Sequence, residues 1–140
     1  MPSKNPQKAQ SQTDTQVREL LAHAVAELGG SLRQGQLNMA LATAHAMENE
    51  THLLVQAGTG TGKSLGYLVP AVRHAVTAAE RVIVSTATLA LQRQIMTRDL
   101  PLVANALAKE LPRKPNIALL KGWNNYVCLH KAQGGYPQDD

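Results

Sequence analysis

Residues whose types suit the binding of a phosphate group are concentrated in one short stretch, Ala57-Gly-Thr-Gly-Thr-Gly-Lys-Ser64. Gly60 and Gly62 let the backbone curl into a nest of N–H groups, because glycine tolerates positive φ. Lys63 offers a cation to the β- and γ-phosphates, and Ser64 offers a hydroxyl oxygen to Mg²⁺. We predict a P-loop with Lys63 and Ser64 as catalytic residues. The other predicted nucleotide-binding residues of this loop are Ala57, Gly58, Thr59, Gly60, Thr61 and Gly62.

The segments on either side of the loop fit this prediction. Residues 52–57 form a short apolar run that predicts a buried strand, and the apolar period from Lys63 to about Ala79 predicts a helix. The helix N-terminus would place unpaired amides and a partial positive charge beside the phosphates. Pro70 should kink this helix, because proline lacks the N–H that would bond to the Gly66 carbonyl. Ala57 replaces the first glycine of the strict pattern, at a position that contributes no donor of its own.

Two more apolar runs, residues 81–86 and 116–120, predict strands of a parallel sheet covered on both faces. Helices are expected between these runs, and two more, at residues 14–28 and 36–49, are expected before the first strand. The alternation predicts a three-layer α/β/α fold with an incomplete parallel sheet. Residues 1–13, rich in Pro, Lys, Gln and Ser, are predicted to be a disordered tail.

The acid that a working NTPase needs at the end of a second strand is not found in the expected place. After Ser64 the acids are Glu80, Asp99, Glu110, Asp139 and Asp140, and none follows an apolar strand. We therefore expect the chain to bind nucleotide without hydrolysing it, either as a fragment or as a non-hydrolysing protein.

The composition of the chain indicates the cellular location and the class of partner to expect. No apolar run is long enough to span a membrane, no signal peptide is visible, and Cys128 is the only cysteine, so a cytoplasmic protein is expected. The formal net charge of +4 allows a polyanionic partner. Three tyrosines, one tryptophan and no phenylalanine argue against a protein that binds single strands mainly by stacking. For the basic cluster Lys109, Arg113, Lys114 and Lys121, a solvated surface is a simpler explanation than contact with DNA.

Four segments in order resemble the N-terminal part of the DinG/XPD-like branch of superfamily 2 helicases. They are Arg33-x-Gly35-Gln36-x-x-Met39, the loop from Gln56 to Ser64 with Tyr67-Leu-Val-Pro70, Val84-Ser-Thr-Ala-Thr-Leu-Ala-Leu-Gln92, and Lys121-Gly-Trp-Asn-Asn-Tyr-Val-Cys128. The resemblance covers about residues 15–131. It implies a P-loop NTPase of the RecA-like type, with residues 14–140 as a truncated N-terminal part of the first motor domain. ATP and Mg²⁺ would bind between this domain and a second motor domain, and hydrolysis would drive 5′→3′ movement along single-stranded DNA.

The resemblance also implies roles for residues outside the loop. Gln36 would read adenine, since an amide donates and accepts at once, and Arg33 would support it. Thr86, Thr88 and Gln92 would contact the DNA backbone, although N-capping by Thr86 or Thr88 explains the same residues equally well. Cys128 matches the first of four thiolates that hold a 4Fe–4S cluster in many relatives. One cysteine cannot hold a cluster, so that role would need a longer protein.

Two other functions remain open for the loop. A small P-loop kinase would carry an arginine-rich lid and turn over ATP without DNA, but it gives Arg33, Gln36 and residues 85–88 no obvious role. A non-catalytic nucleotide-binding or interaction module would be favoured if Lys63→Ala left nucleotide affinity unchanged.

Overall fold

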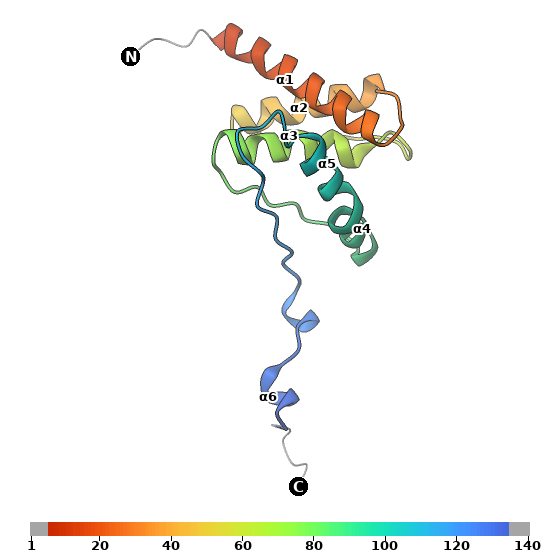
Figure 1. Cartoon of the computed structure of the whole chain (residues 1–140), viewed down its shortest axis with the longest axis vertical. Helices are drawn as coiled ribbons and strands as arrows, with labels where there is room; N and C mark the ends of the chain where they lie inside the picture. Colours follow the sequence, from red (N-terminus) through yellow and green to blue (C-terminus); the bar gives the residue numbers. More distant parts are fainter. Residues whose placement is uncertain (1–5, 135–140) are drawn as a thin grey trace, which may run out of the picture.

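The computed structural model describes residues 6–134, and the regular elements in that range are helical (Figure 1). No helix in this range is long and apolar enough to cross a lipid bilayer. The elements are α1 (Pro6–Glu27), α2 (Gln34–Glu48), α3 (Lys63–Thr77), α4 (Leu89–Gln94), the π-helical turn η1 (Ile95–Asp99), α5 (Leu100–Ala106), the 3₁₀ turn η2 (Trp123–Asn125) and α6 (Leu129–Ala132).

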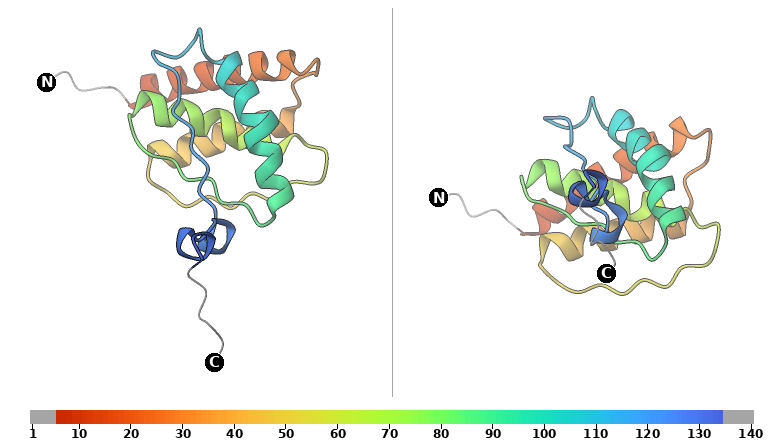
Figure 2. Two further views of the ribbon diagram at one scale, coloured as in Figure 1. Left: turned by 60° about the horizontal axis from the view of Figure 1, so that its bottom comes forward. Right: turned by 90° about the horizontal axis from the view of Figure 1, so that it is seen from below.

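Helix α3 is the centre of the packed body (Figure 2). Helices α1 and α2 pack on one side of it, and the α4–η1–α5 segment packs on a second side through η1 and α5. Nine of its residues are buried, including Gly66 and Pro70, so little of its surface faces solvent. A helix that is apolar on most sides is typical of a core position. The buried side chains that form this core are Val17, Leu20, Leu21, Ala24, Val25, Leu37, Ala40, Ala44, Leu65, Leu68, Val69, Val72, Ile95, Val103 and Leu107.

The helices predicted near the loop form at nearly the predicted positions. Helix α2 covers Gln34–Glu48, and α3 covers Lys63–Thr77 with Pro70 inside it. Helix α1 starts at Pro6, so the predicted tail is helical from there on, and residues 1–5 lie outside the described range. Gln, Lys and Ala are good helix formers, which explains this earlier start.

The predicted parallel sheet is wrong for this structure, because residues 6–134 contain no strand. The three apolar runs are extended but unpaired, and they leave large side chains in solvent: Leu54 is 97% exposed, Ile83 91% and Leu120 86%. A parallel sheet needs adjacent strands that pair with one another and helices that cover both of its faces. Here the helices pack on one another, so the runs lack that cover. Apolar β-branched composition indicates a preference for burial and does not supply a partner strand.

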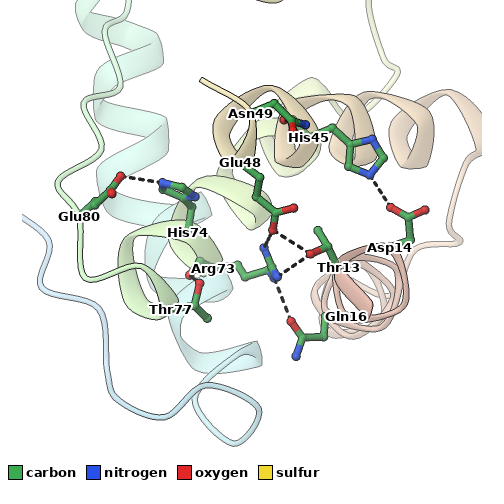
Figure 3. A network of polar contacts seen from close by, with 10 residues as sticks. All are labelled: Thr13, Asp14, Gln16, His45, Glu48, Asn49, Arg73, His74, Thr77 and Glu80. Atoms are coloured by element: carbon green, nitrogen blue, oxygen red, sulfur yellow. Dashed lines mark hydrogen bonds and ion pairs between the residues drawn. The ribbon is translucent and has the colours of Figure 1, made fainter. Parts of the chain in front are cut away.

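A partly buried polar network joins the three long helices at the end opposite the P-loop (Figure 3). Arg73 on α3 donates to Glu48 Oε1 on α2 at 2.8 Å, and to Gln16 Oε1 and Thr13 Oγ1 on α1, both at 3.1 Å. Thr13 also donates to Glu48 at 2.8 Å. Thr13 therefore lies inside the interface between α1 and the other two helices.

Two residues after the end of α2, and again two residues after the end of α3, the backbone is left-handed at a residue that is not glycine. These residues are Glu50, with φ of 52°, and Ala79, with φ of 58°. Beyond each of them the chain turns back as an extended segment, residues 52–57 in one case and 81–86 in the other. The extended segment that starts near residue 115 leaves the helical body and carries η2 and α6 away from it (Figure 1).

Candidate nucleotide-binding site

The P-loop is present as a compact glycine turn at the start of α3. Gly60 and Gly62 both have left-handed backbone, with φ of 76° and 78°. Gly62 is the N-cap of α3, and its carbonyl accepts the first helical bond, from the N–H of Gly66 at 3.2 Å. The hydroxyl of Thr61 donates to the Gly58 carbonyl at 2.9 Å and tightens the turn. The loop therefore directs a helix N-terminus, with its unpaired amides, towards the space in front of it.

The Lys63 side chain folds back over this loop. Its ammonium donates to the carbonyls of Ala57 at 3.0 Å and Gly58 at 2.7 Å. An ammonium group has three donors, so these two bonds leave one N–H for a phosphate oxygen. The lysine is thus held at the loop before any anion arrives, which lowers the entropy cost of binding.

Helix α2 contacts the loop through two side chains that lie one helical turn apart. The Gln36 amide donates to the Gly62 carbonyl at 3.0 Å and is buried, with 5% exposure. Arg33, the residue before α2, donates to the Gly60 carbonyl. The structure therefore brings both residues to the loop. The bond to Gly62 fixes the orientation of the Gln36 amide and leaves its oxygen and a second N–H available to a base.

Ser64 has a neighbour that the sequence pattern did not reveal. Its hydroxyl shares a hydrogen bond with Tyr67. Burial raises the pKa of the Tyr67 hydroxyl above its ordinary value of 10.0; the bond to Ser64 opposes this shift and the nearby Asp99 carboxylate adds to it. Tyr67 is therefore a partly buried neighbour of Ser64 on the same helix. The i, i+3 spacing on one helix is the signal that could have pointed to this pair.

The Asp99 carboxylate lies near the Tyr67 hydroxyl, and it already accepts hydrogen bonds from two other side chains. Its side chain is 4% exposed and accepts from Gln94 Nε2 at 2.9 Å and Arg98 Nε at 3.0 Å. Nothing in the sequence around Asp99 predicted its approach to Tyr67, because the approach depends on the packing of η1 against α3.

The residues predicted to touch DNA lie away from the loop. The Thr88 side chain accepts from the Leu91 N–H at 3.2 Å, so it is the N-cap of α4, as one of the two interpretations required. The Thr86 hydroxyl donates to the Thr88 carbonyl at 3.3 Å. Thr86 and Gln92 line a mainly apolar cavity of about 410 Å³ between α3 and the extended segments. This cavity does not include the P-loop.

Cys128 is exposed at the N-cap position of α6. Within residues 6–134 there is no group of three or more His, Cys, Asp or Glu side chains that could hold a metal ion. One thiolate does not fit an iron–sulfur cluster, which needs four ligands. We derive no chemistry through such a cluster.

A glycine nest at a helix N-terminus, a tethered lysine and a serine at the next position together define a P-loop nucleotide-binding protein. Comparison with known proteins narrows this class. Residues 38–121 match the family model described as DEAD/DEAH box helicase. The chain therefore belongs to the DEAD/DEAH box helicase family, in agreement with the resemblance seen in its motifs.

Individual relatives agree with this assignment. The chain is 57% identical over 124 residues to the ATP-dependent helicase DinG of Mycobacterium tuberculosis, covering 89% of this chain and 19% of that protein. It is 46% identical over 101 residues to the ATP-dependent DNA helicase YoaA of Escherichia coli, covering 72% and 15%. It is 39% identical over 119 residues to a Bacillus subtilis protein named 3′-5′ exonuclease DinG, covering 84% and 12%. The chain thus spans less than a fifth of the length of these relatives, and no solved structure matches it.

Proposed function

We propose that this chain is the ATP-binding part of the first motor domain of an ATP-dependent DNA helicase. In the longer protein, ATP with Mg²⁺ binds between this domain and a second motor domain, and hydrolysis drives 5′→3′ movement along single-stranded DNA. The observation that carries the proposal is the tethered Lys63 ammonium at the N-terminus of α3. The relatives named as ATP-dependent helicases support the choice of ATP and DNA.

The residues present fit this nucleotide. Lys63 and the loop amides bind the phosphates, and Ser64 supplies a hydroxyl oxygen to Mg²⁺. The Gln36 amide, oriented by the Gly62 carbonyl, is positioned to donate to and accept from adenine, with Arg33 bracing the loop. Thr86, Thr88 and Gln92 are proposed to contact DNA phosphates. Cys128 is proposed as a cluster ligand only in a longer protein that supplies three more thiolates.

Nucleotide affinity tests the proposal directly. We expect the chain to bind ATP by titration calorimetry, and Lys63→Ala to weaken binding about 10- to 100-fold, because a charge-assisted hydrogen bond contributes about 1.5–3 kcal/mol. Lys109→Ala is the matched control, since Lys109 is an exposed lysine outside the loop. Equal affinity of Lys63→Ala and the control would contradict the proposal and favour a non-nucleotide role for the loop.

A second measurement tests the role of Gln36. We expect Gln36→Ala to reduce the preference for ATP over GTP while ADP and ATP stay in the same order of affinity. Unchanged discrimination would remove Gln36 from the base site and leave the phosphate site intact.

A further inference from the structure

The formal net positive charge of the chain comes from one segment, residues 112–134. That segment contains four Lys and Arg residues and no Asp or Glu. The rest of the chain contains ten basic and ten acidic residues, so the whole formal net charge of +4 belongs to this segment. Such segregation of charge matches a polyanionic partner better than a protein surface of mixed charge.

The same segment is the most exposed part of the described structure. Residues 115–120 pass alongside α3, where they line the apolar cavity, and the chain then leaves the helical body with two short helical turns (Figures 1 and 2). Every residue from Asn116 to Gly134 is exposed. We call residues 112–134 the basic arm.

A small turn on the basic arm presents two aromatic rings. The N–H of Asn125 bonds to the Gly122 carbonyl at 2.9 Å, and that of Tyr126 bonds to the Trp123 carbonyl at 3.2 Å. The Lys121 N–H donates to the Tyr126 hydroxyl at 2.9 Å and closes the turn. Trp123 is 92% exposed and Tyr126 53% exposed. We call residues 121–126 the aromatic turn.

We propose that the aromatic turn stacks on a base of single-stranded DNA while the lysines and arginine of the basic arm hold the neighbouring phosphates. Every base has a flat π-face that suits an exposed indole, and cations beside it suit the backbone. The sequence composition argued only against a protein that binds mainly by stacking, and a single turn needs just two rings. The choice of DNA over RNA rests on the proposed function; the stacking itself rests on the arm alone.

Trp123 gives the proposal a direct readout, because it is the only tryptophan in the chain. The full 140-residue chain is titrated with an oligo(dT) strand, without nucleotide, and its tryptophan fluorescence is followed. An abasic strand of the same length and charge is the control. We expect strong quenching by oligo(dT) and little by the abasic strand. Equal quenching by both strands would overturn the stacking, as would quenching that follows self-association in sedimentation.

Substitutions distinguish the contribution of the Trp123 ring to DNA binding from that of the charged side chains. We expect Trp123→Leu to weaken binding of a labelled dT strand about 10-fold, within the range measured for stacked bases, and Trp123→Phe to keep most of the affinity. Val127→Ala is the matched control, since Val127 is a 78% exposed aliphatic residue of the same arm, and it should have no effect. Lys121→Gln should reduce the slope of log affinity against log salt by about 0.7. A Trp123→Leu variant that binds within twofold of the parent would overturn the proposal.

Two further measurements identify the kind of nucleic acid that binds and distinguish this proposal from the proposed function. An oligo(rU) strand that bound more tightly than oligo(dT) would overturn the assignment to DNA. Lys63→Ala should leave DNA binding by the arm unchanged. If only the DNA-binding proposal is wrong, the chain will bind ATP but not DNA. If only the nucleotide-binding proposal is wrong, the chain will bind DNA but not ATP.

Discussion

Gly62 is the residue at which the Gln36 side chain of α2 contacts the glycine loop. Its φ of 78° is left-handed, which favours glycine. A Cβ at this position would lie 2.3 Å from the Gln36 amide nitrogen. Its carbonyl accepts from that same amide. Two independent requirements, backbone conformation and space for Gln36, therefore make glycine necessary here.

We expect Gly62→Ala to lower the free energy of unfolding by about 1–3 kcal/mol, because alanine would be strained at positive φ and would displace Gln36. ATP affinity should fall with it, since the loop and the Gln36 amide move together. Urea unfolding and ATP titration measure the two effects. Gly58→Ala is the control, because a Cβ at Gly58 meets nothing within 4 Å. Equal effects of the two substitutions would show that Gly62 has no special geometry.

The sequence predicted a glycine loop at the start of a helix, and the structure contains that loop; nucleotide binding by its residues stays a prediction. Lys63, Ser64 and the glycines lie within a few positions of one another, and Gln36 and Arg33 came from a motif. Tyr67 and Asp99 were missed. The i, i+3 spacing of Ser64 and Tyr67 could have pointed to the first of these. The approach of Asp99 to Tyr67 depends on the packing of η1 against α3, and a linear pattern does not contain that information.

At the scale of elements, α2 and α3 run side by side and are joined at both ends. Gln36 and Gly62 join their N-terminal ends, and Glu48 and Arg73 join their C-terminal ends. The Arg73 side chain is 10% exposed and Glu48 is 31% exposed, so the second junction is largely shielded from water. Helix α1 locks this junction through Thr13 and Gln16 (Figure 3).

We expect Arg73→Met to lower the free energy of unfolding by about 2–3 kcal/mol, less than for a fully buried pair because Glu48 keeps some contact with solvent. Arg93→Met is the control, since Arg93 is exposed, and it should change stability by less than about 0.5 kcal/mol. A double-mutant cycle with Glu48→Leu measures the pair by urea unfolding. A coupling energy near zero would show that the network does not hold the helices together.

The helices and the strands differ in how far sequence alone could predict them. A helix is specified by periodicity within one segment, so α2 and α3 were placed correctly to within about two residues. The start of α1 was set too late because its polar first turns lack an apolar period. The runs at 52–57, 81–86 and 116–120 have strand composition, but strand pairing is a relation between distant segments, and in this structure it does not occur.

At the scale of the whole molecule, a packed helical body holds the nucleotide site and a basic arm extends from it (Figure 1). Within residues 6–134, the acids that follow Ser64 each have a side-chain partner already. Among the described acids after Ser64, Glu80 pairs with His74 and Glu110 lies 3.7 Å from His23. Asp99 is held by Gln94 and Arg98.

We therefore expect the 140-residue chain to bind ATP without hydrolysing it, in the presence or absence of single-stranded DNA. Phosphate release should equal the rate in buffer and should be the same for Lys63→Ala. DNA-stimulated release that disappeared in Lys63→Ala would show that a catalytic acid is present after all.

The left-handed residues at the ends of α2 and α3 have a consequence for how much stability the molecule has in reserve. Glu50 and Ala79 each hold a backbone conformation that costs a residue with a side chain about 1–2 kcal/mol. Glycine would adopt it freely at the end of a helix. Both turns lie on the path that leads to a site segment, so they set its direction while storing strain. Glycine at either position would keep the direction of the turn and remove the strain, so Glu50→Gly and Ala79→Gly are the first substitutions to try for a more stable form of this fold.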